Sequence, residues 1–174
     1  MAWKGVVTNA GKELLNTMAE GRHTMTITRA AAGSGSVEEA NMREATALKS
    51  EETEASIISA TTDSDGVTTF KVQVGPAEEA EYECTEIGLW AKVDDGDAVL
   101  FALHQTTDTG INIPTKANYP SFAASVYVKH EIKNDGDLTI NIDTTAYVSQ
   151  STMDEQNIGF CIENGLVCQR YWTE

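Results

Sequence analysis

The residues that could carry chemistry are thinly spread along this sequence. Three of its turns are rich in aspartate: Asp63-Ser64-Asp65-Gly66, Asp94-Asp95-Gly96-Asp97 and Asn134-Asp135-Gly136-Asp137. They lack the further spaced oxygen ligands and the closing glutamate of an EF-hand loop, so they predict hairpin turns and not calcium sites. The stretch Gly33-Ser34-Gly35-Ser36 has no Gly-Lys-Ser/Thr of a phosphate loop behind it, and we interpret it as a flexible connector.

The histidines and cysteines give no metal-site signature. His23, His104 and His130 fall in predicted strands without a His-x-x-x-His or Glu-x-x-His spacing, which favours a partly exposed sheet position for each. Cys161 and Cys168 admit a cross-strand disulfide, or a zinc site with one of the histidines. Their spacing and the expected compartment favour two reduced, packed thiols.

Catalytic signatures are also missing from the sequence. It contains no Gly-x-Ser-x-Gly elbow, and its Ser, His and Asp residues do not form a triad signature. We therefore predict a protein that is not an enzyme and has neither a cofactor nor a resident metal.

The composition limits the remaining function classes. The chain has 174 residues, 41% of them hydrophobic, which is enough for one domain with a core and a tail. Its 27 acidic and 12 basic residues give a net charge of −15, which disfavours nucleic acid and anionic membranes as partners. No apolar run has the length of a signal peptide or of a membrane span, so we expect folding in the cytoplasm.

The hydrophobic pattern predicts an α+β fold, β-rich and mostly antiparallel. An amphipathic helix is expected at residues 6–21, capped by Thr8 or Asn9, with Leu14, Leu15 and Met18 on one face and Gly21 as its stop. A strand is expected at residues 24–31. Residues 37–48 indicate either a short surface helix or an ordered loop.

Alternation of apolar and polar residues then predicts hairpins. The first joins residues 56–61 to 68–74, and the second joins residues 87–93 to 99–103. Residues 122–132 alternate for longest and predict a central, half-buried strand, which the Asn-Asp-Gly-Asp turn connects to residues 138–142.

The chain is expected to divide into a domain at residues 1–148 and a tail at residues 149–174. The tail begins as a polar linker, and Asn164-Gly165 predicts a hairpin that places Cys161 opposite Cys168. A lone hairpin is marginal in water, so this one should need a partner surface, from its own chain or a neighbour's.

Trp90 marks a second apolar face on the hairpin of residues 87–103. It shares that face with Gly88, and the following strand adds Leu100 and Ala102, so both faces of this strand pair should be covered. Either the N-terminal helix covers the second face, or another copy or a neighbouring protein does, with Trp90 as an anchor. The predicted interface residues are Trp90, Leu100, Ala102, Phe160, Ile162, Leu166, Val167 and Trp172.

The order of motifs resembles a known family. TNAGKELL in the first helix, ITRAAAGSG, TEIGLWA, VLFALHQ, VYVKHEI and DLTINID together resemble the N-terminal tail-collar domain of tail-fibre proteins from contractile-tailed bacteriophages and related prophage tails. The similarity covers roughly residues 2–148. Its most specific parts are the opening helix, the GSG loop and Glu86-Ile87-Gly88-Leu89-Trp90.

The resemblance implies a structural module of a phage or phage-like tail, assembled in the bacterial host cytoplasm. Such a module attaches a fibre to the baseplate, usually as a homotrimer, and the second apolar face would then be a symmetric subunit contact. In the family a long shaft and a receptor-binding tip follow the collar. Because this sequence ends after a linker and one hairpin, we expect a fibre connector; the alternative is a receptor- or carbohydrate-binding module in which Trp90, Tyr119 or Trp172 stacks on sugars.

Overall fold

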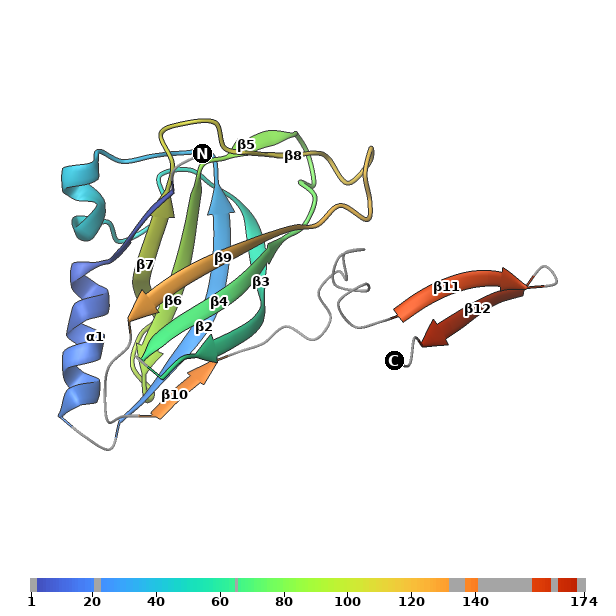
Figure 1. Cartoon of the computed structure of the whole chain (residues 1–174). Helices are drawn as coiled ribbons and strands as arrows, with labels where there is room; N and C mark the ends of the chain where they lie inside the picture. Colours follow the sequence, from blue (N-terminus) through green and yellow to red (C-terminus); the bar gives the residue numbers. More distant parts are fainter. Residues whose placement is uncertain are drawn as a thin grey trace.

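A curled, mostly antiparallel β-sheet with one short helix beside it forms the body of the chain in the computed structural model (Figure 1). The structure describes residues 3–20, 23–64, 66–131, 137–140, 158–163 and 166–171, with the backbone alone given for residue 131 and those after it. This architecture confirms the predicted β-rich class with an N-terminal helix. The sheet runs in the order β1 (Lys4–Val7), β7 (Val99–Gln105), β6 (Glu86–Val93), β2 (Thr24–Gly33), β3 (Glu51–Thr62), β4 (Val67–Val74) and β9 (Ala124–Glu131).

The N-terminal helix begins later than predicted. Helix α1 spans Asn9–Ala19, and the residues before it form β1, which pairs antiparallel with β7. Thr8 has an extended backbone, and its side chain accepts a hydrogen bond from the backbone N–H of Gly11 at 2.9 Å, as the predicted cap requires. Gly11 lies so close to the carbonyl oxygen of Phe101 that a Cβ would not fit, which fixes the helix against β7. Gly21, the predicted stop, lies outside the described residues.

The two hairpins are confirmed. β6 pairs with β7 around a turn in which Asp94 has a φ of 48°, and β3 pairs with β4 around a turn in which Gly66 has a φ of 79°. Positive φ values match the Asp-Gly chemistry that predicted these turns. Residues 37–48 contain a short 3₁₀ helix, η1 (Glu39–Glu44), as one of the two predicted alternatives.

The strand predicted from residues 122–132 is shorter and lies elsewhere in the sheet. It spans Ala124–Glu131 as β9, pairs with β4 and forms an end of the sheet order, so its predicted central position is wrong. Alternation indicates that one face of a strand is buried, but it does not give the position of the strand in the sheet. Here the sheet curls, so the core also covers one face of an edge strand. β10 (Asp137–Ile140) pairs in parallel with β2 and not with β9, so the predicted third hairpin is wrong as well; residues 132–136, which hold its turn, are outside the described part.

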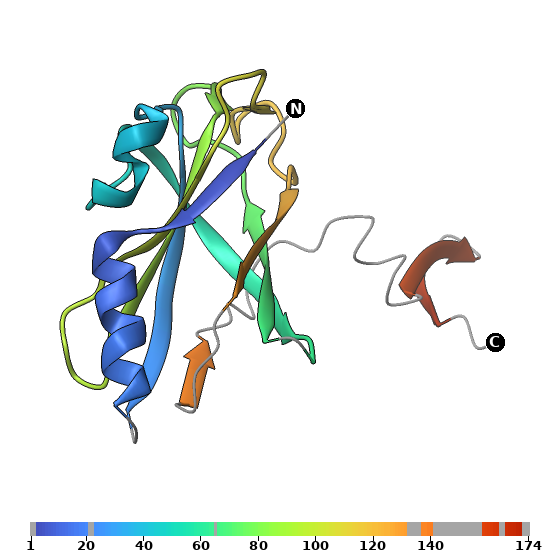
Figure 2. The same ribbon diagram turned by 60° about the vertical axis from the view of Figure 1, so that its left-hand side comes forward.

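Figure 2 shows β3 and β4 diverging from β2, with β10 beside the free part of β2. A small sheet that the sequence did not predict, β5 (Tyr82–Cys84) with β8 (Ile111–Ile113), lies at one end of the body. Two further strands, β11 (Ile158–Glu163) and β12 (Leu166–Tyr171), pair with each other in antiparallel register. The docking role that the sequence predicts for them stays a prediction.

Two hydrophobic clusters lie on opposite faces of β2, β6 and β7. The larger one lies inside the curl, where side chains of most strands of the body meet; among them are Ile27, Phe70, Leu89, Phe101 and Val128. The smaller one lies on the other face and consists of Ala31, Met42, Leu48, Trp90, Leu100 and Leu103. The register of β6 and β7 shifts between Leu89 and Trp90, so Ala102 belongs to the larger cluster, although alternation grouped it with Leu100.

Candidate functional site

The end of the body that holds the 34–50 segment is built around one buried carboxylate. Glu86 begins β6, is 0% exposed and accepts hydrogen bonds from three backbone N–H groups. The donors are Gly35 at 3.2 Å, Lys49 at 2.9 Å and Ser50 at 2.7 Å. A buried charge is tolerated when it is fully hydrogen-bonded, and Glu86 meets that condition through fixed backbone dipoles. We call Glu86 with these three amides the Glu86 clasp.

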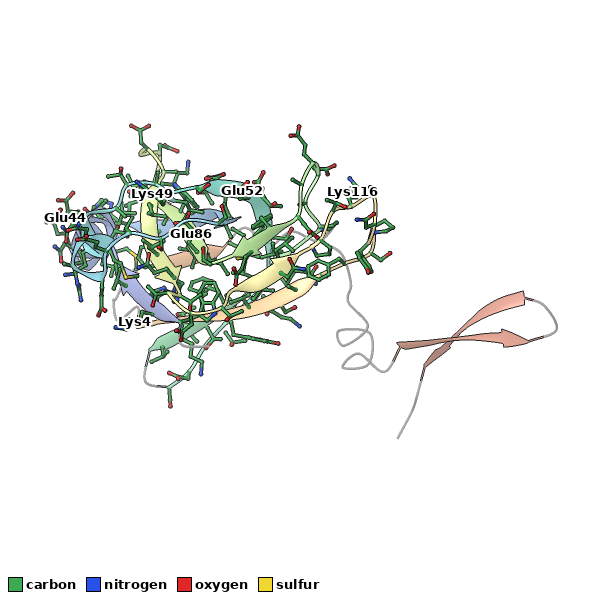
Figure 3. All side chains as sticks on the ribbon, turned by 90° about the horizontal axis from the view of Figure 1, so that it is seen from above. Lys4, Glu44, Lys49, Glu52, Glu86 and Lys116 are labelled. Carbon is green, nitrogen blue, oxygen red and sulfur yellow. The ribbon has the colours of Figure 1, made fainter. Side chains whose placement is uncertain are left out.

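Gly33 and Gly35 are closely packed against the residues of the clasp. A Cβ on Gly33 would lie 2.3 Å from the carbonyl oxygen of Ser50, and one on Gly35 would lie 2.6 Å from the Cβ of Lys49. The Thr85 hydroxyl donates to the carbonyl of Gly35 at 2.8 Å. The Gly-Ser-Gly-Ser stretch is therefore a closely packed loop, and its interpretation as a flexible connector is wrong. Figure 3 looks down on this end, where Lys49, Glu52 and Glu86 are grouped.

Buried hydrogen bonds also connect the start of the N-terminal helix to β7. The Thr8 hydroxyl donates to the carbonyl of Leu100 at 2.5 Å, and the Thr8 backbone N–H donates to the carbonyl of Phe101 at 2.9 Å. The motifs that carry the family resemblance are thus joined: the helix cap holds the VLFALHQ strand, and the TEIGLWA strand holds the GSG loop. Their polar residues serve the architecture of the fold.

Trp90 and Leu100, predicted at a subunit interface, lie inside this chain. They are 9% and 1% exposed, and Ala102 is fully buried in the larger cluster. Met42 of η1 and Leu48 cover Trp90 and Leu100 in the smaller cluster. None of the three is therefore exposed as the predicted contact surface requires: Trp90 and Leu100 are covered by Met42 and Leu48, and Ala102 is buried inside the curl. The predicted alternative, cover by the N-terminal helix, named the wrong element.

A cation completes the cover of Trp90. The Arg29 guanidinium carbon lies 4.0 Å from the centroid of the Trp90 ring, and its two terminal nitrogens bind the Glu51 carboxylate at 2.9 and 2.6 Å. Planar stacking and a two-point carboxylate contact are the geometry that arginine provides and lysine does not.

The other predicted interface residues belong to the tail. Phe160 and Ile162 are in β11, and Leu166 and Val167 are in β12, for which the structure gives the backbone alone. Trp172 lies outside the described residues. Cys161 and Cys168 face each other in the register of these strands, and the state of their thiols stays a prediction.

Two of the three histidines form a buried pair. The Nε2 atoms of His104 in β7 and His130 in β9 are 2.6 Å apart, and the residues are 8% and 7% exposed. Burial, then the neighbouring His130, lowers the pKa of His104 to about 3; burial lowers the pKa of His130 to about 4. The expected partly exposed state is wrong for both and confirmed for His23, whose Nδ1 lies 2.6 Å from the Asp94 carboxylate.

Sequence reasoning missed the Glu86 clasp and the histidine pair. The signal for the first was an acidic residue at the start of an apolar run. The second had no local signal, because its members are 26 residues apart on strands that only the curl brings together.

An acidic hollow of about 350 Å³ opens beside β5. It is lined by Glu52, Ala77, Glu78, Glu79, Ala80 and Tyr82. Burial raises the pKa of the Tyr82 hydroxyl to about 12 and that of the nearby Cys84 thiol to about 11. Cys84 is therefore a poor nucleophile near neutral pH.

Within the ranges that the structure describes, no group of three or more His, Cys, Asp or Glu residues is arranged to hold a metal ion. Among these same residues no helix is long and apolar enough to cross a membrane. Comparison with protein-family models, with curated proteins and with solved structures finds no match to this chain.

Proposed function

We propose that this chain is a structural component of a phage or phage-like tail, which attaches a fibre to the baseplate or acts as a fibre connector. The observation that carries the proposal is the Glu86 clasp. It joins two of the three most specific elements of the resemblance, the GSG loop and the EIGLW strand, through hydrogen bonds from backbone N–H groups to the Glu86 carboxylate. Residues with such a role keep a shape constant, as an attachment module requires.

In this proposal residues 1–148 form the attachment domain and residues 149–174 a linker with a β-hairpin that docks on a partner chain. The partners are other copies of the chain, as a homotrimer, and baseplate or other tail proteins. Because Trp90 and Leu100 are covered by their own chain, the subunit contact falls to other surfaces. Phe160, Ile162, Leu166, Val167 and Trp172 of the hairpin supply its apolar side chains.

The proposal is tested by removing the gene from the phage or prophage that encodes it. Particles made without the chain should lack fibres in electron micrographs while keeping tail tubes and sheaths, and the chain should be found by mass spectrometry in purified complete tails. Complementation with the full chain should restore the fibres. A chain truncated after residue 148 is the matched variant, and it should fold but fail to restore them. Complete fibres on particles without the chain would refute the proposal.

Oligomeric state gives an independent test. Sedimentation at micromolar concentration should show a trimer for the full chain and a smaller species after truncation at residue 148. A Trp90→Ser variant serves as a control, since Trp90 lies within its own chain: it should lose stability before it loses assembly. A full chain that stays monomeric over this concentration range would contradict the proposed trimer.

A receptor- or carbohydrate-binding module is the second candidate, and the exposure of Tyr119 favours it. Tyr119 is 62% exposed in the loop before β9, where its ring is open to a sugar face, whereas Trp90 is covered. Binding on a glycan array that disappears in a Tyr119→Ser variant would favour this candidate. Absence of binding on the array would favour the fibre connector.

A further inference from the structure

The two edges of the curled sheet meet without a described backbone ladder between them. β9 ends the strand order on one side and β1, followed by β7, on the other. β9 crosses in front of the sheet in Figure 1, and it contacts β1 at the opposite edge. At this seam the Nε2 atoms of His104 and His130 lie 2.6 Å apart, so a side-chain hydrogen bond connects the two edges.

Close packing shields the histidine pair. The Phe101 ring meets the His130 ring edge-on at 73°, with centroids 5.7 Å apart. On the other side β1 passes directly over His104: a Cβ on Gly5 would come within 2.2 Å of the His104 Cε1 and 2.4 Å of its Nδ1. A side chain at position 5 would collide with the His104 ring, so the pair is enclosed by the β1 backbone on the His104 side and by the Phe101 ring on the His130 side.

The residues facing the pair offer nothing to stabilise a positive charge. His104 is in register with Gly5 of β1 and Ile87 of β6, and His130 is in register with Thr68 of β4. None of these three titrates near neutral pH. The described charges nearest along the strands point away: Lys4 binds Glu39 at the surface, and Lys129 is exposed. Each histidine thus has the other as the titratable group that faces it within the described residues.

We propose that the His104–His130 hydrogen bond is a proton-sensitive closure, which holds the two edges of the sheet together at neutral pH and releases them in acid. With both rings neutral, one Nε2–H donates to the lone pair of the other Nε2. With both rings protonated, both Nε2 atoms are donors and two like charges lie 2.6 Å apart, so the bond breaks.

The direction follows from the two states of the seam. In the closed state burial holds the pKa of His104 at about 3 and that of His130 at about 4, whereas in the opened state each ring returns toward the ordinary value of about 6.5. The closure is therefore complete above pH 6.5 and is lost as the pH falls from 6.5 toward 4. Each proton taken up on opening raises the opening equilibrium constant about tenfold per pH unit in that window.

Hydrogen exchange of the full chain tests the closure. Amide exchange is followed by mass spectrometry from pH 7 to 4.5, with rates corrected for the intrinsic pH dependence of exchange. Opening of β1 and of the β9 end near His130 should increase about tenfold or more per pH unit below pH 6. Amides of β2 and β6, inside the sheet, should keep their protection.

A His104→Gln/His130→Gln variant removes the titration but keeps a side-chain hydrogen bond available, and its seam should open equally at pH 7 and pH 5. A His23→Gln variant is the matched control at an exposed histidine, and it should behave as the unchanged chain. An equal loss of protection in all strands, or the same pH response in the double variant, would overturn the proposal.

Histidine NMR of the unchanged chain gives a second measurement should the double variant fail to fold. In the folded protein His104 and His130 should stay neutral at pH 6, with one ring protonated on Nε2 and the other on Nδ1. Either ring found charged at pH 6 in the folded protein would refute the closure.

Discussion

The Glu86 clasp and the His104–His130 seam are both buried polar contacts that hold distant segments together, but they differ in their partners. Glu86 is bound by three main-chain N–H groups, whose positions and charges do not change with pH. The histidines are bound to each other through a proton that one must have and the other must lack. A buried hydrogen bond therefore persists over the pH range in which its partner groups keep their protonation states. One end of this fold is fixed by its backbone, and the seam depends on protonation.

Loss of the clasp should have the largest effect. A Glu86→Ala variant leaves the N–H groups of Gly35, Lys49 and Ser50 without their acceptor in a packed loop, and we expect the free energy of unfolding to fall by about 4 kcal/mol. Urea denaturation measures this. Glu52→Ala is the matched control, because Glu52 is exposed and accepts from the hydroxyls of Ser34 and Ser50; it should cost less than about 1 kcal/mol. Equal losses of stability in the two variants would contradict the special role of the buried, amide-bound Glu86.

Much of the sheet was accessible from the sequence, because β2, β6 and β7 are apolar runs bounded by turn residues, and in β6 and β7 both faces are apolar and both are covered. β1 was missed because its four residues are too few for a pattern, and Val6 and Val7 continue the apolar face of the helix behind them. In longer strands the prediction was wrong for a different reason. The register shift beside Trp90 moves Ala102 to the other face, and no residue type announces it.

The site was predictable only in part, since cover and closure are properties of the folded chain. Trp90 was recognised as needing a cover, but Met42 and Leu48, which supply it, are isolated apolar residues in a polar stretch. The histidine pair exists only because the sheet curls. Periodicity within a strand states that a face is buried and leaves open which segment buries it.

The seam should make the whole protein sensitive to mild acid. Between pH 7 and pH 5 the unfolded chain takes up protons on His104 and His130, whose pKa values in the folded state, about 3 and about 4, keep them neutral. Stability is thus present above about pH 6.5 and lost as the pH falls, by about 3–4 kcal/mol at pH 5 for the two together. Denaturant titrations at the two pH values measure it. The His104→Gln/His130→Gln variant should lose much less over the same interval, and an identical loss would place the effect elsewhere.

Gly5 should be the sensitive position of β1. A Gly5→Ala variant drives a methyl group into the His104 ring, and because that ring is held by His130, which itself packs against Phe101, we expect a loss of about 2 kcal/mol. Thermal and urea unfolding measure it. Combining Gly5→Ala with His104→Ala, which vacates the space, should cost less than the sum of the two single changes. Strict additivity would show that the two residues do not meet.

Arg29 should give the smallest effect, and it separates packing from charge near the Glu86 end. Its side chain is 35% exposed, so screening by solvent weakens the contact with Glu51, while the stacking on Trp90 at 4.0 Å does not depend on salt. Arg29→Ala should lower the free energy of unfolding by about 1 kcal/mol, and Arg29→Lys, which keeps the charge but not the planar stack, should recover less than half of it. Urea denaturation in low salt and in roughly 0.5 M salt, which screens exposed ion pairs, separates the ion pair with Glu51 from the stacking on Trp90. If stacking dominates, the loss persists in high salt; a loss that disappears there assigns the contact to charge and leaves the cover of Trp90 to Met42 and Leu48.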